Sequence, residues 1–181
     1  MNLVGAALER RAPGWARRWA LRALFRATAR AFDRPLPSLA GLSADQRLLR
    51  YAERTRDWAG ELLRDGGDPA AVQARLYRNA LRLGQACRWL CGLRGQRDAL
   101  AMGRLLYRWL EIDFRADGEA ILIRRCYFSR LYSSDICQVM SALDRGLLAG
   151  LSGGRQLAFS ERITEGRPGC RARLTREDGR G

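Results

Sequence analysis

The chain has 181 residues, 47% of them hydrophobic, and carries a formal net charge of +14 at pH 7. This length fits one domain, or one domain with an appended helical region, and the hydrophobic content can fill a core. The sequence contains no run of 18 apolar residues and no signal-peptide pattern, so it predicts neither a membrane-spanning helix nor a secreted protein.

All 33 basic residues are arginine, and the chain contains no histidine. The arginines are spread along the chain without an aromatic–basic repeat, so we expect no nucleic-acid partner. They form either a solvated surface or one that attracts an anionic membrane. Without histidine, a Ser-His-Asp triad or Cys-His pair is excluded, and acid–base work falls to aspartate, glutamate, tyrosine or cysteine. Five cysteines without dense spacing indicate reduced thiols and a cytoplasmic protein.

Residues 1–34 are the most basic segment, and a basic amphipathic helix is predicted over residues 15–32. Its arginines at positions 18, 22, 26 and 30 recur every four residues and therefore share one stripe. Such a helix could lie peripherally on an anionic membrane or dock on a protein partner. Alternatively, its apolar side packs on its own domain. Two prolines and a glycine predict a linker over residues 35–42.

A single α+β domain is predicted over residues 43–176, and helices fill its first part, residues 43–111. Ser43 and Gln46 form a capping box for a helix that ends near residue 64. Asp68 caps the next helix, with Pro69 at its first position. A third helix is expected over residues 98–111.

The second part, residues 119–176, predicts a small antiparallel sheet with a helix crossing it. A strand is expected at residues 119–125, a helix at 135–151, and a hairpin of two strands at 156–163 and 170–176. On the last strand, Cys170 faces the core and the neighbouring arginines point away. The fold class is therefore α+β with an N-terminal helical region, and residues 177–181 are expected to fray.

Three cysteines and one aspartate of this second part form the candidate site: Cys126, Cys137, Asp144 and Cys170. Cys137, Ser141 and Asp144 have helical spacing and share a stripe, which Cys170 would face from the sheet. A helix N-terminus near Cys137 and arginines near Cys126 would lower the thiol pKa values, and the resulting thiolate could attack an electrophilic carbon. This interpretation needs no cofactor.

Two other interpretations of the cysteines stay open. Cys126, Cys137 and Cys170 could bind zinc or an iron–sulfur cluster, although no Cys-x2-Cys pair is present. They could also be small apolar fillers of the core. Nearby, Tyr127 is a candidate proton donor or pocket wall, and Gly166 is expected in a turn with positive φ.

The spacing Cys126-x10-Cys137-x6-Asp144, followed by Thr164-x-Gly166-x3-Cys170, resembles the C-terminal half of the L-2-amino-thiazoline-4-carboxylic acid hydrolase family. The resemblance implies a hydrolase that opens the C–N bond of a cyclic amidine. A more distant similarity to the 4-vinyl reductase domain implies instead a module that binds a small molecule without catalysis. In the first case Cys126, Cys137, Asp144 and Cys170 would be the catalytic residues. Tyr127, Ser141 and Gly166 would be the substrate-binding residues.

Overall fold

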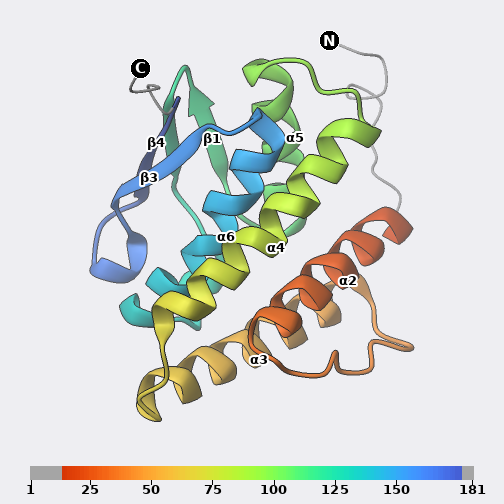
Figure 1. Cartoon of the computed structure of the whole chain (residues 1–181), viewed down its shortest axis with the longest axis vertical. Helices are drawn as coiled ribbons and strands as arrows, with labels where there is room; N and C mark the ends of the chain where they lie inside the picture. The colour runs from red at the N-terminus through yellow and green to blue at the C-terminus, as the bar shows by residue number, and fades with distance from the viewer. Residues whose placement is uncertain (1–13, 177–181) are drawn as a thin grey trace.

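The computed structural model describes residues 14–176 (Figure 1). The first part of the basic segment, residues 1–13, and the expected frayed tail, residues 177–181, lie outside the described residues. The elements follow one another in the order α2 (Gly14–Ala31), α3 (Ala44–Arg64), α4 (Pro69–Leu90), α5 (Gln96–Trp109), β1 (Phe114–Asp117), β2 (Ala120–Ile123), η1 (Tyr127–Arg130), α6 (Ser134–Ser152), β3 (Gln156–Glu161), η2 (Ile163–Glu165) and β4 (Cys170–Thr175). Helices thus precede a small antiparallel sheet, and the predicted α+β class is confirmed.

Side-chain caps fix the helix starts where the sequence predicts them. Oγ of Ser43 accepts a hydrogen bond from the Gln46 amide at 3.2 Å, and the Ser43 amide donates to Oε1 of Gln46 at 2.8 Å. Asp68 caps α4, and Oγ of Ser133 accepts from the backbone of the first turn of α6. Because each cap satisfies amides that the helix leaves without partners, these boundaries are encoded locally.

The four strands form one antiparallel sheet in the order β1-β2-β4-β3. The predicted hairpin of β3 and β4 is confirmed, and β4 also pairs with β2, so that Ile123 lies opposite Cys170. Alternate residues of β4, beginning with Cys170, are buried, whereas Arg171 and Arg173 are exposed, as expected. Strand β1 was not predicted. It pairs with β2 across the turn at residue 118.

Helix α6 is central to the fold because it packs on the sheet and on α4 (Figure 1). Its C-terminal residues Leu148 and Leu151 belong to the core formed with α5 and the sheet. Its N-terminal half, including Val139 and Leu143, shares a second core with α4. The α4–α6 contact is close enough that a Cβ atom on Gly146 would lie 2.2 Å from the backbone oxygen of Tyr77.

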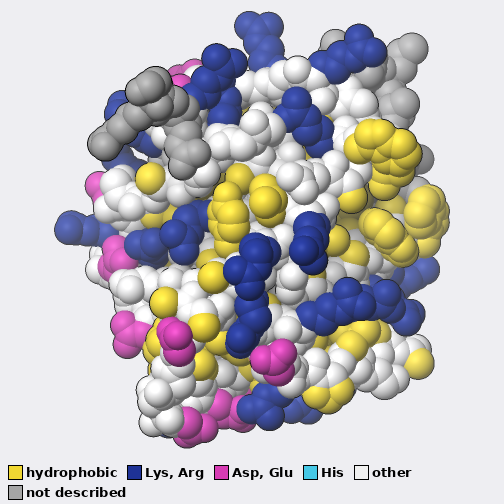
Figure 2. Space-filling view, viewed as in Figure 1, with side chains coloured by type: hydrophobic (Ala, Val, Ile, Leu, Met, Phe, Trp, Pro, Cys, Tyr) yellow, Lys and Arg dark blue, Asp and Glu magenta, His cyan; other side chains and the backbone are white. Residues whose placement is uncertain are grey.

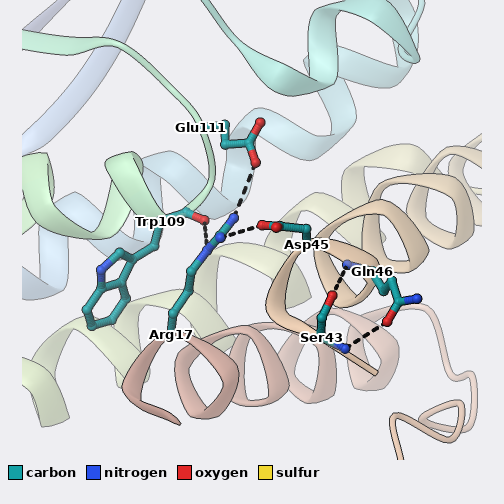
Figure 3. A network of polar contacts seen from close by, with 6 residues as sticks. All are labelled: Arg17, Ser43, Asp45, Gln46, Trp109 and Glu111. Carbon is teal, nitrogen blue, oxygen red and sulfur yellow. Dashed lines mark hydrogen bonds and ion pairs between the residues drawn. The ribbon is translucent and has the colours of Figure 1, made fainter. Parts of the chain in front are cut away.

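Helix α2 packs on the remainder of the chain, which is the alternative left open by the sequence. Leu21, Phe25 and Ala29 are buried, and the predicted arginine stripe is exposed. Arg17 connects α2 to two other helices (Figure 3). Its Nη1 lies 2.5 Å from Oδ1 of Asp45, and its Nε donates to the carbonyl of Trp109 at 2.8 Å. Residues 14–31 are therefore part of the same packed unit as the other helices.

Candidate functional site

A cavity of about 380 Å³ lies between α2, α4, α5, α6 and the sheet. Its walls are largely apolar and include small side chains on α2 and α4, such as Ala20, Ala23 and Ala80, which leave space that larger residues would fill. This volume falls in the range of natural small-molecule pockets. The cavity is therefore large enough to enclose a small organic ligand.

Three polar residues from separate elements meet at one end, which we call the inner end: Tyr107 on α5, Asp144 on α6, and Arg162 between β3 and η2. The Tyr107 hydroxyl donates to Oδ1 of Asp144 at 2.6 Å. Burial raises the pKa of Asp144 to about 6, against the lowering effects of the Tyr107 hydrogen bond and the Arg162 charge. The carboxyl can therefore exchange its proton near neutral pH.

Arg162 contributes a hydrogen-bond donor that is not fully used. Its Nη1 lies 3.2 Å from Oε1 of Glu165, and its guanidinium carbon lies 5.0 Å from the centre of the Phe159 ring. Its Nε is buried and has no hydrogen-bond partner among the described residues. Since a buried N–H without an acceptor is unfavourable, a ligand acceptor at this position would satisfy it.

All three candidate cysteines line this same cavity, together with Asp144, so the sequence spacing does bring these four residues to one site. The backbone amide of Ile163 donates to Sγ of Cys170 at 3.4 Å. Burial raises the thiol pKa of all three, to about 12 for Cys126. The lowered pKa values expected from neighbouring arginines are not found, because those at positions 124, 125 and 130 are exposed to solvent. The thiols are protonated at neutral pH.

No preformed metal site is seen in residues 14–176. Within this range, no three or more cysteine, aspartate or glutamate side chains are arranged so that they could hold a metal ion. Cys126, Cys137 and Cys170 line one cavity but do not make such a group. The zinc or iron–sulfur interpretation therefore has no ligand set in the described part of the chain.

The other predicted site residues are placed differently. Ser141 lines the cavity, but its hydroxyl donates to the carbonyl of Gln138 at 2.8 Å. Tyr127 lies instead at a separate surface pocket, with the guanidinium of Arg130 at 5.9 Å from its ring centre. Gly166 has the expected positive φ, 80°, in an exposed turn after η2. The structure thus does not bring Tyr127 or Gly166 to the cavity.

Tyr107 and Arg162 were not predicted as site residues from the sequence. Tyr107 lies 37 residues before its partner Asp144 and belongs to no local motif. Arg162 is one of 33 arginines, and its position directly before η2 gives no signal of its own. A tyrosine inside a strongly periodic helix was the available clue, because a buried hydroxyl requires a polar partner.

In comparisons with known proteins, no family model, curated protein or solved structure matches the chain. The resemblance to the thiazoline carboxylate hydrolases, and to the 4-vinyl reductase domain, therefore stays a prediction. Within residues 14–176, no helix has both the length and the apolar character required to cross a bilayer.

Proposed function

We propose that the chain binds a mostly apolar small molecule in the cavity, with the polar group of that molecule at the inner end. The observation that carries this proposal is the cavity of about 380 Å³, which runs among apolar side chains to Tyr107, Asp144 and Arg162. Apolar walls would contribute most of the affinity, at roughly 25 cal/mol for each Å² removed from water. The few polar groups would orient the ligand.

The inner end defines the polar group that fits it. Asp144 offers a carboxyl oxygen as acceptor, and Nε of Arg162 offers a buried donor without a partner in the described residues. A ligand that carries both a donor and an acceptor, such as an amide or a hydroxyl beside a carbonyl, would satisfy both. An entirely apolar molecule would leave Nε of Arg162 unsatisfied and should bind less tightly.

A fluorescence titration with a neutral naphthylamine dye tests this proposal. Ala86 lines the cavity from α4, and Ala74 lies on the same helix outside the cavity. We expect Ala86→Trp to weaken dye binding by about tenfold or more, because the indole occupies ligand space. The matched variant Ala74→Trp should bind like the wild type. Equal affinity in all three proteins, or no saturable binding in any, would overturn the proposal.

A second candidate is hydrolysis of a cyclic amidine, and the pKa of Asp144 favours it. A carboxyl with a pKa of about 6 is suited to accept a proton from water at neutral pH. The activated water would add to the amidine carbon. The C–N bond of the ring would then break, and the protonated carboxyl would return its proton to the leaving nitrogen. The cysteines, as neutral thiols, would form part of the cavity wall around the substrate and would not attack it.

Turnover assays with cyclic amidines, including L-2-amino-thiazoline-4-carboxylate, separate the two candidates. If Asp144 is the base, Asp144→Asn should lower the rate by about 10² or more. Ser152→Ala, which changes a hydroxyl bonded within the same helix and outside the cavity, should leave the rate near wild type. Wild-type turnover no faster than that of Asp144→Asn would reject catalysis and leave binding in place.

A further inference from the structure

Large hydrophobic side chains surround the opening of the cavity. Trp15 and Trp19 on α2 are each 65% exposed, Leu90 on α4 is 67% exposed, and all three line the cavity. We call these three residues the cavity mouth. Figure 2 shows hydrophobic side chains gathered at this edge, over the start of α2 and the end of α4, with arginines beside them. Exposed tryptophans of this kind are typical of a surface that meets an apolar phase.

The helices that carry the mouth are strongly basic. Helix α2 contains five arginines and α4 contains four, and neither contains an aspartate or glutamate. Arg18 and Arg22 follow Trp15 and Trp19 by three residues each, so each arginine lies about one turn from a tryptophan. Both are exposed, and neither forms an ion pair with another described residue. Their charge is therefore available to an anionic partner.

We infer that the cavity mouth docks on the surface of an anionic phospholipid bilayer, and that the bound ligand passes between bilayer and cavity there. Tryptophans prefer the depth of the lipid headgroups, and arginines beside them would pair with lipid phosphates. An acidic protein could match the charge. It would not explain why the exposed apolar residues are also the rim of a lipophilic cavity, whereas a bilayer explains both observations.

The ligand-exchange part of this inference rests on the proposed function. An apolar ligand dissolves poorly in water and collects in membranes. A mouth seated on the headgroups would let the ligand enter the cavity without crossing water. Tyr107 at the inner end is 2% exposed, whereas the mouth residues are 65–67% exposed, so the polar group of the ligand would pass the mouth to reach the inner end.

Co-sedimentation with vesicles tests the docking face on the full chain. At low salt we expect about tenfold tighter binding to phosphatidylcholine vesicles with one third phosphatidylglycerol than to phosphatidylcholine alone. The double variant Trp15→Ala/Trp19→Ala should lose about tenfold in affinity for the anionic vesicles. Leu49→Ala/Leu63→Ala is the control, because both side chains are exposed on α3 and neither lines the cavity. Its binding should equal that of the wild type.

A charge variant and an exchange assay complete the test. Arg18→Gln/Arg22→Gln should weaken binding to anionic vesicles, and the exposed sheet-side pair Arg124→Gln/Arg173→Gln should weaken it less. Transfer of the naphthylamine dye from vesicles should be slower for Arg18→Gln/Arg22→Gln, while its dye affinity without vesicles stays within about threefold of wild type, because neither arginine lines the cavity.

Several results would overturn the inference. Absence of binding to anionic vesicles, or equal losses in Leu49→Ala/Leu63→Ala and Trp15→Ala/Trp19→Ala, would reject the docking face even if dye still binds in solution. Dissociation of a dimer by Trp15→Ala/Trp19→Ala, without a change in vesicle binding, would assign the mouth to a second copy of the chain. Vesicle binding without dye binding would reject ligand exchange together with the proposed function, but would leave the docking face.

Discussion

The hydroxyl of Tyr107 donates a 2.6 Å hydrogen bond to Oδ1 of Asp144, and this bond joins α5 to α6 at the inner end of the cavity. Burial raises the pKa of both groups, that of Tyr107 to well above its usual value. Tyr107 therefore stays a donor at every physiological pH, and the proton of Asp144 is the one that can move. The polar character of the cavity should change with the ionisation of Asp144.

The stability of the fold should report this ionisation. Because the folded-state pKa of Asp144 is raised to about 6, the folded chain holds a proton that the unfolded chain loses near pH 4. The free energy of unfolding should therefore fall as pH rises from about 4 to 6, by up to about 3 kcal/mol from this group. Asp144→Asn removes the effect, so its stability relative to wild type should increase over the same interval. Urea denaturation at a series of pH values measures the free energy of unfolding of both proteins. A difference between them that does not change with pH would contradict the raised pKa of Asp144.

Removing the donor should make the carboxyl harder to ionise. Tyr107→Phe keeps the ring, which stacks on Phe114 with centres 4.7 Å apart, but deletes the hydroxyl bonded to Asp144. We expect the pKa of Asp144 to rise further and the free energy of unfolding near pH 7.5 to fall by about 1–3 kcal/mol. Carbon NMR of labelled aspartate follows the titration. A lower pKa in Tyr107→Phe would show that the hydrogen bond does not stabilise the carboxylate.

The cavity thiols should react slowly with iodoacetamide, which modifies the thiolate form. Burial raises the pKa of Cys126 to about 12 and also raises those of Cys137 and Cys170. At about pH 7.5, each should be modified at least tenfold more slowly in the folded chain than in the denatured chain. Mass spectrometry of peptides gives the rate at each cysteine. Rapid modification of Cys126 in the folded chain would restore the thiolate interpretation of the site.

Because α4 packs closely on α6, adding even one side-chain carbon between them should lower the free energy of unfolding. A Cβ on Gly146 would lie 2.2 Å from the Tyr77 backbone oxygen, and backbone cannot move aside cheaply. Although alanine favours a helix, we expect Gly146→Ala to lower the free energy of unfolding by about 3 kcal/mol. Gly60→Ala is the control, because the nearest atom there is the flexible end of Arg64. Equal effects in the two variants would contradict the packing argument.

The elements with local signals were predictable from sequence. Helix α6 begins after a serine cap and ends at Ser152, directly before Gly153, which has a φ of 79°. The β3–β4 hairpin follows from alternation and a turn. Strand β1 was missed because Phe114–Asp117 is four residues long and follows the acidic residues Glu111 and Asp113, which suggest a solvated turn. Its strand character comes from pairing with β2, a contact that no local pattern reveals.

The candidate site was also predictable only where a local pattern in the sequence fixes the direction of a side chain. Helical spacing placed Cys137 and Asp144 on one stripe, and the alternation of β4 aimed Cys170 at them; all three line the cavity. The cavity itself was not predictable, because it depends on how α2 packs against α4, which lies far from it in sequence. Nor was the chemical state of the thiols, since their pKa values follow from burial and not from the arginines beside them in sequence.

Calorimetric titration of the chain with an apolar ligand that carries one amide group tests the central claim most directly. The account predicts saturable binding of one molecule per chain, a negative heat-capacity change as apolar surface is buried, and loss of the signal in Ala86→Trp but not in Ala74→Trp. Absence of saturable heat, or the same isotherm for both tryptophan variants, would contradict a ligand-binding cavity.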